Sequence, residues 1–252
     1  MGNRPALNIT QLKTAIPSIN AVCNWIPAGV GGDAEDDDAL LERGSRGVRH
    51  SGRAVTVQDY EDLARLASPQ VARARCVPLC DLAADPSGKQ RRPGVVSVII
   101  VPQSNDPQPI PGAQLLESVL AYLRSRSSPA ACISVVPCDF IRIDVEADIV
   151  LSEPDRAAQI ELAVKGALAN FLHPLHGGAN NLGWGFGRMP YKSDLFRLIE
   201  GIRGVEYVRD VRIFSLAQRE DVEQSNHFLV SPGEFTVQCT LLSTASAVGG
   251  GA

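Results

Sequence analysis

The segment from Ile141 to Leu151 constrains the fold most, because apolar and charged residues alternate along it without interruption until its last positions. The intervening positions carry Arg142, Asp144, Glu146 and Asp148. Successive side chains of a strand point to opposite faces of a sheet, so the pattern predicts a strand with one face in the core and one in water. We therefore expect a sheet that is covered on one side only.

The residues that follow this strand predict the rest of one α+β unit. Pro154 stands where a first helical turn tolerates it, and the helix behind it has an apolar face, formed by Ile160, Val164, Ala167, Leu168 and Phe171. Ser193 is expected to cap a shorter helix, and strands are predicted over 205–214 and 235–241. This unit should span residues 138–242, with a flexible glycine-rich tail at 243–252.

Residues 56–137 are predicted to form another α+β unit. Thr56 with Asp59 three residues later resembles a capping box, which predicts a helix that ends at Ser68-Pro69. Strands are expected at 71–77 and 95–101, joined in antiparallel fashion, and the second is so continuously apolar that it should be central. A helix at 112–126 and a strand at 133–136 complete a β-β-α-β unit.

The first 55 residues differ from both units. Residues 1–32 are rich in turn formers and predict an extended arm, and a helix is expected from Asp33 to His50 with acidic residues first and basic residues last. Its apolar stripe is thin, so the helix should need tertiary contacts or contacts with a partner. The predicted fold class is α+β: an N-terminal extended arm and helix, followed by two small α/β sandwich-like units with mostly antiparallel or mixed sheets.

Composition excludes several functional classes. Hydrophobic residues make up 44% of the 252 residues and charged residues 21%, which are ordinary globular values. The net charge of −4 does not favour nucleic acid as a partner. No apolar run of membrane-spanning length and no signal peptide are recognisable, so we expect synthesis in the cytoplasm without direct membrane insertion. The six cysteines are expected to be reduced thiols.

Two clusters could carry chemistry, and each has a structural interpretation. Cys76 and Cys80 could bind zinc together with Cys132 and Cys138 or with two histidines, but the spacing is poor and Cys76 alternates with apolar residues as a small hydrophobe would. His173-Pro-Leu-His176 could supply a general base, yet no nucleophile motif accompanies it. A small metal-binding or hydrolytic enzyme is therefore the alternative interpretation.

The loop at 176–190 contains Gly183-Trp-Gly-Phe-Gly-Arg188, which lacks the glycine spacing of phosphate-binding loops. We interpret its glycines as residues that permit tight turns and close backbone approach. Trp184, Phe186 and Tyr191 are expected to anchor the loop in an apolar pocket, either inside the subunit or against a neighbour. The acidic run from Glu35 to Asp38 would fan around a helix, so we interpret it as a solvated face and not as a cation site.

Three stretches together resemble one known family. The first runs from Asn24 to Arg43 and contains Gly32-Asp-Ala-Glu, and the second is Gly52-Arg-Ala-Val-Thr-Val-Gln-Asp-Tyr. The third begins at Phe171, contains Gly183-Trp-Gly-Phe-Gly-Arg and ends with Gly204-Val-Glu-Tyr-Val. In order and spacing they are similar to the baseplate J-like family, the wedge proteins of contractile phage tails and related contractile injection systems. Family members usually carry a further domain first, so we expect a short member, a split gene or a fragment.

The resemblance implies a structural protein and not an enzyme, without cofactor, metal or catalytic residue. It implies a baseplate wedge subunit that links the central hub and spike to the sheath base and rearranges on contraction. The expected partners are other wedge subunits, including a second J-like protein, the sheath-base protein and the hub or spike proteins. The residues expected to contact partners or anchor the loop are Asp33, Glu35, Arg43, Arg46, Arg49, Arg53, His173, Gly177, Gly178, Trp184, Phe186 and Arg188.

Overall fold

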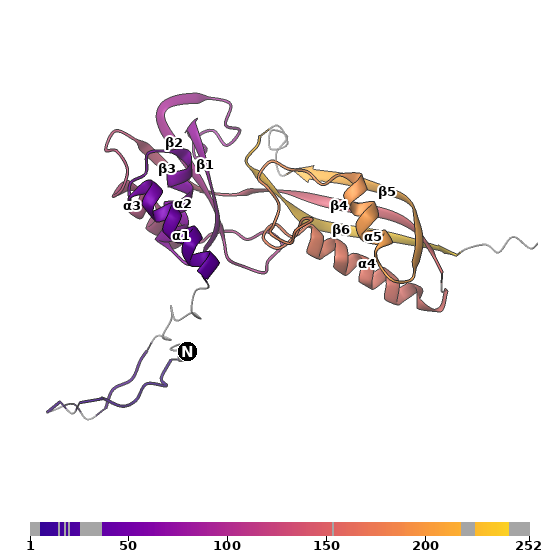
Figure 1. Ribbon diagram of the computed structural model, residues 1–252, viewed down its shortest axis with the longest axis horizontal. Helices are drawn as coiled ribbons and strands as arrows, with labels where there is room; N and C mark the ends of the chain where they lie inside the picture. The colour runs from indigo at the N-terminus through magenta and orange to yellow at the C-terminus, as the bar shows by residue number, and fades with distance from the viewer. Residues whose placement is uncertain are drawn as a thin grey trace, which may run out of the picture. The chain divides into compact units, whose positions relative to one another are not determined.

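The computed structural model describes residues 6–14, 16–17, 19, 21–25, 37–152, 154–217 and 225–241 (Figure 1). The chain forms two compact units, an N-terminal unit Met1–Ser51 and a C-terminal unit Gly52–Ala252. The N-terminal unit contains helix α1, Asp37–His50, and the C-terminal unit contains two three-stranded sheets with their helices. These elements confirm the predicted α+β class with small mixed sheets.

The first sheet has the strand order β1-β2-β3. Its elements are α2 (Val57–Ala67), β1 (Val71–Cys80), β2 (Arg91–Pro102), α3 (Ala113–Arg124) and β3 (Cys132–Pro137). Strand β2 pairs antiparallel with β1 and parallel with β3, so the most apolar strand is central, as its sequence predicts. Helices α2 and α3 contact each other and cover the sheet over a core that includes Leu63, Val98, Ile100, Val119 and Leu123.

Ala54 and Thr56, which precede α2, are held by hydrogen bonds and by packing in the first core. The Thr56 hydroxyl accepts a hydrogen bond from the Asp59 N–H at 3.2 Å, and the Asp59 carboxylate accepts one from the Thr56 N–H at 2.8 Å. This confirms the predicted capping box. The Ala54 N–H donates to the Arg126 carbonyl at 2.9 Å, and the Ala54 side chain is buried in the core. The core of the C-terminal unit therefore begins before α2.

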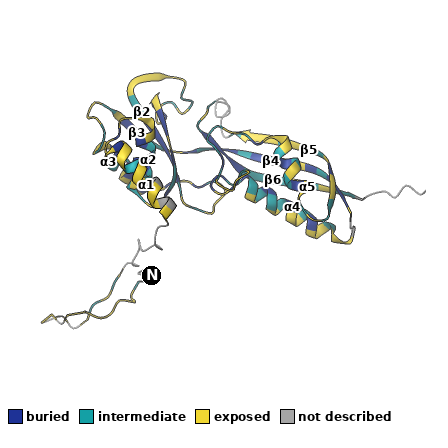
Figure 2. Ribbon diagram, in the orientation of Figure 1, coloured by how far each residue is buried: buried dark blue, intermediate teal, exposed yellow. Residues whose placement is uncertain are grey.

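The second sheet has the order β5-β4-β6, with β4 antiparallel to β5 and parallel to β6. Its elements are β4 (Asp139–Leu151), a 3-10 turn (Pro154–Arg156), α4 (Ala157–Phe171), α5 (Lys192–Glu200), β5 (Val205–Ala217) and β6 (Phe228–Leu241). Along β4 the buried residues alternate with more exposed ones up to Asp148, which confirms the alternation read from the sequence (Figure 2). Helices α4 and α5 pack against β6 and β5.

Two local expectations were wrong. Helix α5 begins at Lys192, so Ser193 lies inside the helix and does not cap it. The Asp194 carboxylate caps the first turn by accepting a hydrogen bond from the Tyr191 N–H at 3.4 Å. Strand β6 begins at Phe228 and not near Phe235. The run Ser231-Pro232-Gly233 resembles a turn in sequence, but an irregularity in the pairing with β4 between Ile143 and Val145 accommodates it.

A third apolar cluster joins the two sheets inside the C-terminal unit. Val77 and Val101 of the first sheet pack there with Phe140 and Leu229 of the second, and the Leu175 side chain completes the contact. Burial of these side chains opposes separation of the sheets, because exposing them would return apolar surface to water. The segment around Leu175 thereby lies where both sheets can contact it.

Candidate functional site

The connection between α4 and α5, residues 172–191, carries the largest group of predicted site residues, and we call it the glycine-aromatic loop. Its backbone folds back on the end of α4: the Gly178 N–H donates to the Phe171 carbonyl at 2.8 Å and the Gly177 N–H to the His173 carbonyl at 2.9 Å. The Gly183 N–H closes the loop by donating to the Gly177 carbonyl at 2.9 Å. The loop is therefore ordered by its own main chain.

Two glycines occupy positions that no other residue fills without strain. A Cβ atom on Gly177 would overlap the Phe171 carbonyl oxygen. Gly183 has φ +82°, and a Cβ atom there would lie 2.6 Å from the Pro174 carbonyl oxygen. A left-handed conformation and a close main-chain approach both require glycine. The hydrogen-bonded turn thus depends on residues that have no side chain.

Trp184 holds the loop to the core of the second sheet. Its side chain is 8% exposed, and the indole Nε1–H donates to the Phe171 carbonyl at 2.7 Å. The Trp184 and Phe171 rings meet edge to face, with centroids 5.4 Å apart. Tyr191, in contrast, is 68% exposed, so it does not anchor the loop within this chain. It precedes α5 at the N-cap position.

Arg73 of β1 fastens the same loop from the first sheet. Its guanidinium donates to the carbonyl oxygen of Pro174 at 3.1 Å and to that of Trp184. The guanidinium carbon also lies 5.1 Å from the centroid of the Phe186 ring. Sequence reasoning missed Arg73, because its contacts are 101 and 111 residues away and the surrounding Val71-Ala-Arg-Ala-Arg indicates only a strand. The loop is thus held by both sheets.

The imidazole of His173 binds the backbone of its own turn and stacks on His176. The Nδ1 atom of His173 accepts the N–H of Leu175 at 3.2 Å and that of His176 at 3.3 Å, and the two imidazoles stack at 4.7 Å. Burial, reinforced by the charge of His176, lowers the pKa of His173. Within the described residues, His173 makes no hydrogen bond to a hydroxyl or thiol side chain. The Nδ1 atom of His173 is thus occupied by main-chain donors of its own turn.

The remaining predicted residues belong, in sequence, to the stretch that ends with α1, to the segment just before α2, and to the glycine-aromatic loop. Asp33 and Glu35 lie outside the described residues, as does the side chain of Arg43. Arg46 is half-buried and Arg49 exposed on α1 in the N-terminal unit, whereas Arg53 is exposed just before α2. In the loop, Phe186 is half-buried and Arg188 exposed. The structure thus gathers His173, Gly177, Gly178, Trp184, Phe186 and Arg188 in one loop.

The cysteines that could have formed a zinc site are free thiols. Cys76 lies in β1 with its side chain in the first core, where burial and then the charge of Glu61 raise its pKa to about 12. Cys138 is buried between the sheets, and burial raises its pKa as well. Among the described residues, no group of three or more histidine, cysteine, aspartate and glutamate side chains is placed to hold a metal ion.

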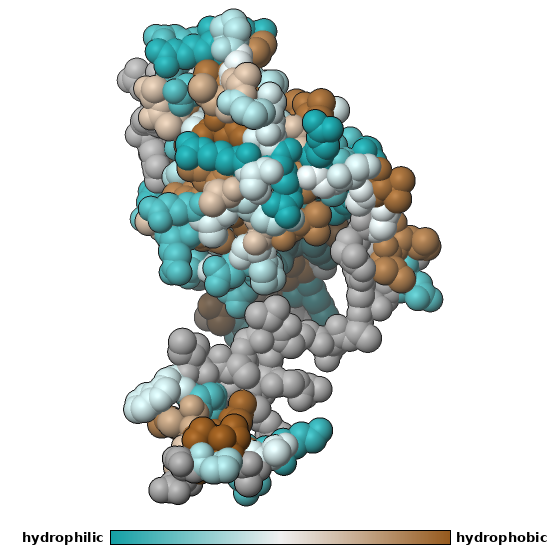
Figure 3. Space-filling model, turned by 90° about the vertical axis from the view of Figure 1, so that its left-hand side faces the viewer, coloured by the Kyte–Doolittle hydropathy of each residue, from teal (hydrophilic) through white to brown (hydrophobic). Residues whose placement is uncertain are grey.

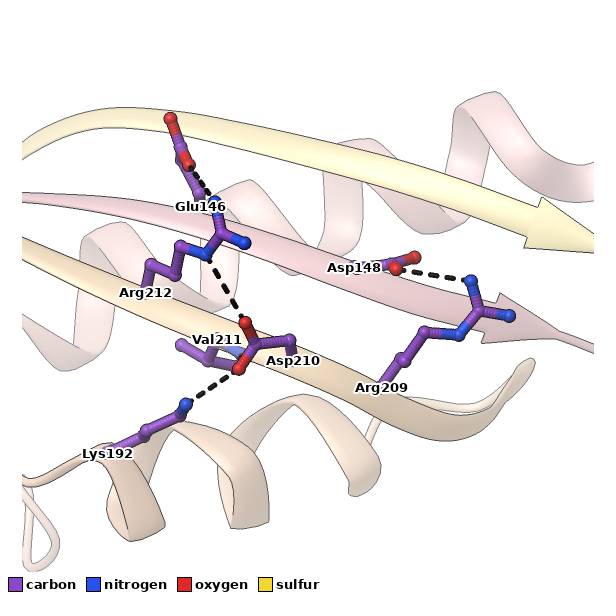
Figure 4. A network of polar contacts seen from close by, with 7 residues as sticks. All are labelled: Glu146, Asp148, Lys192, Arg209, Asp210, Val211 and Arg212. Atoms are coloured by element: carbon purple, nitrogen blue, oxygen red, sulfur yellow. Dashed lines mark hydrogen bonds and ion pairs between the residues drawn. The ribbon is translucent and has the colours of Figure 1, made fainter.

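The solvent-facing side of the second sheet carries a network of charges (Figure 4). Asp210 accepts a hydrogen bond from Lys192 at 2.7 Å, and Arg212 lies 3.3 Å from Asp210 and 4.0 Å from Glu146. Arg209 pairs with Asp148 at 3.3 Å. The hydrogen bond from Lys192, more than any other contact, lowers the pKa of Asp210. Each of these carboxylates has a basic partner, so this face is an exposed ion-pair network with little net contribution to stability.

The N-terminal unit exposes apolar side chains. Trp25 is 82% exposed, and on α1 Leu41 and Val48 are 71% and 81% exposed. Apolar surface is visible among the hydrophilic residues in Figure 3. None of the described helices is both long enough and apolar enough to cross a membrane.

No protein-family model and no curated protein matches this sequence. A similar chain occurs among solved structures, in the cryo-electron-microscopy structure of the anti-feeding prophage baseplate determined with sixfold symmetry. The two chains superpose with a TM-score of 0.62 at 17% sequence identity, and the match covers 92% of this chain and 49% of that chain. This chain therefore shares its fold with about half the length of a chain from that baseplate.

Proposed function

We propose that this chain is a structural subunit of the baseplate wedge of a contractile injection system or phage-tail-like particle. The observation that carries the proposal is the fold that it shares, over 92% of its residues, with a chain of the anti-feeding prophage baseplate. As a J-like wedge subunit it links the central hub and spike to the sheath base and rearranges on contraction. Its partners are other wedge subunits, including a second J-like protein, the sheath-base protein and the hub.

The glycine-aromatic loop supports a mechanical role. Its conspicuous groups all have structural partners: Trp184 binds the Phe171 carbonyl, His173 accepts two backbone N–H groups, and Arg73 donates to two carbonyl oxygens. Main-chain hydrogen bonds and an arginine that joins two sheets make a stiff element. A subunit that transmits force between neighbours needs such stiffness, and it needs no cofactor, metal or catalytic residue.

The N-terminal unit supports the assembly role. Its helix α1 presents Leu41 and Val48 to solvent, and Trp25 precedes it with most of its surface exposed. A helix with so little buried apolar surface is stabilised chiefly by packing against another surface. We propose that residues 1–51, including the predicted contacts Asp33, Glu35, Arg43, Arg46 and Arg49, bind neighbouring subunits in the particle, and that the chain is incorporated there after synthesis in the cytoplasm.

The direct test is genetic and structural. Tail-like particles purified from the source cells should contain this chain when analysed by mass spectrometry. Deletion of its gene should leave particles without an assembled baseplate in electron micrographs, and a plasmid copy should restore them, because a wedge subunit is required before the sheath can polymerise on its base. Baseplates of normal appearance in the deletion strain would contradict the proposal.

A further inference from the structure

A pocket of about 320 Å³ lies beside the glycine-aromatic loop in the C-terminal unit. Its walls come from the end of α2, the start of β1, the residue after β2 and the loop, and they include Arg65, Ala72, Arg73, Gln103, His176 and Leu182. Among the described residues, the walls include two arginines and no aspartate or glutamate. The pocket is therefore lined by cationic groups without an acidic counterpart.

The two arginines retain unused hydrogen-bond donors. The Nε atom of Arg65 is shielded from solvent and has no hydrogen-bond partner within the described part of the chain. Arg73 makes both of its carbonyl hydrogen bonds through Nη1, which leaves Nη2 and Nε without one among the described residues. A shielded donor without an acceptor costs free energy, because it has lost its hydrogen bonds to water. An acceptor placed in the pocket would instead pair with those guanidinium donors of Arg65 and Arg73 that line it.

The positive charges of Arg65 and Arg73, which both line the pocket, repel each other. The pKa of Arg73 is lowered first by burial and then by the positive charge of Arg65. Within the described residues, neither arginine has a carboxylate within ion-pair distance. An anion in the pocket would attract both arginines that line it, and guanidinium groups bind carboxylates with two parallel hydrogen bonds.

We propose that this pocket binds the carboxylate side chains of an acidic segment of a neighbouring subunit. The rim favours a peptide: Leu182 is 80% exposed and Leu175 lies in the wall, so apolar residues flanking the acidic ones have a surface to cover. The chain's net charge of −4 does not favour nucleic acid as the source of the anion. The inference rests on the proposed function only in assigning the segment to a neighbouring subunit.

The test uses the full chain and a defined probe, the peptide acetyl-Leu-Glu-Asp-Leu-amide, followed by NMR of the arginine Nε–H resonances. The Arg65 and Arg73 signals should shift in a saturable manner, and the neutral peptide acetyl-Leu-Gln-Asn-Leu-amide should cause no such shift. Arg65→Gln should weaken binding by about tenfold or more, since a charge-assisted hydrogen bond is lost. The matched control Arg124→Gln alters an exposed arginine on α3 and should leave binding unchanged.

Three results would overturn the proposal. The first is an equal shift of the arginine signals with both peptides, and the second is an unchanged affinity for the acidic peptide in Arg65→Gln with its melting temperature retained. The third is a higher affinity for inorganic phosphate or for a DNA oligonucleotide than for the acidic peptide. Particle assembly is scored separately in cells that carry the same variant. If the chain enters particles but binds no acidic peptide, the pocket inference fails and the wedge function stands. If it binds the peptide but is absent from particles, the wedge function fails while the carboxylate site stands.

Discussion

At the scale of single residues, the glycine-aromatic loop depends on side chains whose polar atoms form hydrogen bonds with main-chain groups. The Trp184 indole combines apolar burial with one hydrogen bond, and His173 gives its Nδ1 lone pair to two N–H groups of the following turn. Both residue types have reactive or binding roles in other settings. Here their partners are the carbonyl group of Phe171, at the end of α4, and amide groups of the loop, so their removal should first affect stability.

Trp184→Ala should lower the free energy of unfolding by on the order of 3 kcal/mol, because it empties a large buried site. The Phe171 carbonyl keeps the Gly178 N–H as a donor, so the loss arises mainly from packing. Trp184→Phe should cost less, about 1 kcal/mol, since it refills most of the site and loses the indole hydrogen bond. Urea denaturation measures both. Trp25→Ala, at a residue 82% exposed, serves as the control and should change little.

If Trp184→Ala unfolds at the same urea concentration as the parent chain and still enters particles, the loop is not anchored through the indole.

Stability should fall as the pH drops below about 6.5, the ordinary pKa of histidine. Burial lowers the pKa of both His173 and His227 in the folded state. As the pH falls, these histidines therefore bind protons at a higher pH in the unfolded chain than in the folded one. The full stability is therefore present above the unfolded pKa and is lost as the pH falls toward the folded values. His173→Asn keeps an acceptor near Nδ1 and should flatten this dependence in melting curves between pH 7 and pH 5. Parallel curves for variant and parent would exclude His173 as a source.

At the scale of elements, the same residue type has opposite effects in the loop and in the helix that precedes it. Gly183 adopts φ +82° against the Pro174 carbonyl, whereas Gly166 lies in α4, where a Cβ atom would meet nothing within 4 Å. A glycine is required where the backbone is left-handed and crowded, and it is a weakness inside a helix. The two positions form a matched pair for one substitution.

Gly183→Ala should destabilise the chain by about 2 kcal/mol, since an alanine is strained in the left-handed region and would press on the Pro174 carbonyl. Gly166→Ala should instead stabilise it by about 0.5–1 kcal/mol through helix propensity. Chemical denaturation of the two variants beside the parent chain gives both values. Equal effects of the same sign would mean that the loop turn is not the source of the glycine requirement.

At the scale of the whole molecule, the border between the two units fixes where a deletion should end. Ala54 is buried in the first core and Thr56 caps α2, so a deletion through residue 55 would damage the C-terminal unit. A chain that begins at Gly52 preserves both contacts. It also removes α1 and the exposed apolar residues before it.

Removal of Met1–Ser51 should leave a cooperative melting transition close to that of the full chain, because the three apolar clusters of the C-terminal unit stay intact. The truncated chain should not be retained by neighbouring wedge, sheath-base or hub proteins in a pull-down. Normal retention would refute the assembly role of the N-terminal unit. Broad, non-cooperative melting would show that this unit also supports the fold of the rest.

Local sequence patterns determined the elements and their buried faces. The alternation along Ile141–Leu151 specified a one-sided strand, the unbroken apolar run in β2 specified a central one, and Thr56 with Asp59 specified a helix start, because each pattern follows from backbone geometry within a few residues. The tertiary structure alone decided the rest. Pro232 and Gly233 lie within β6 because an irregularity in its pairing with β4 accommodates them, and Arg73 meets the carbonyl of Trp184 from 111 residues away. Such contacts depend on which surfaces meet after the elements pack, and no local pattern encodes that.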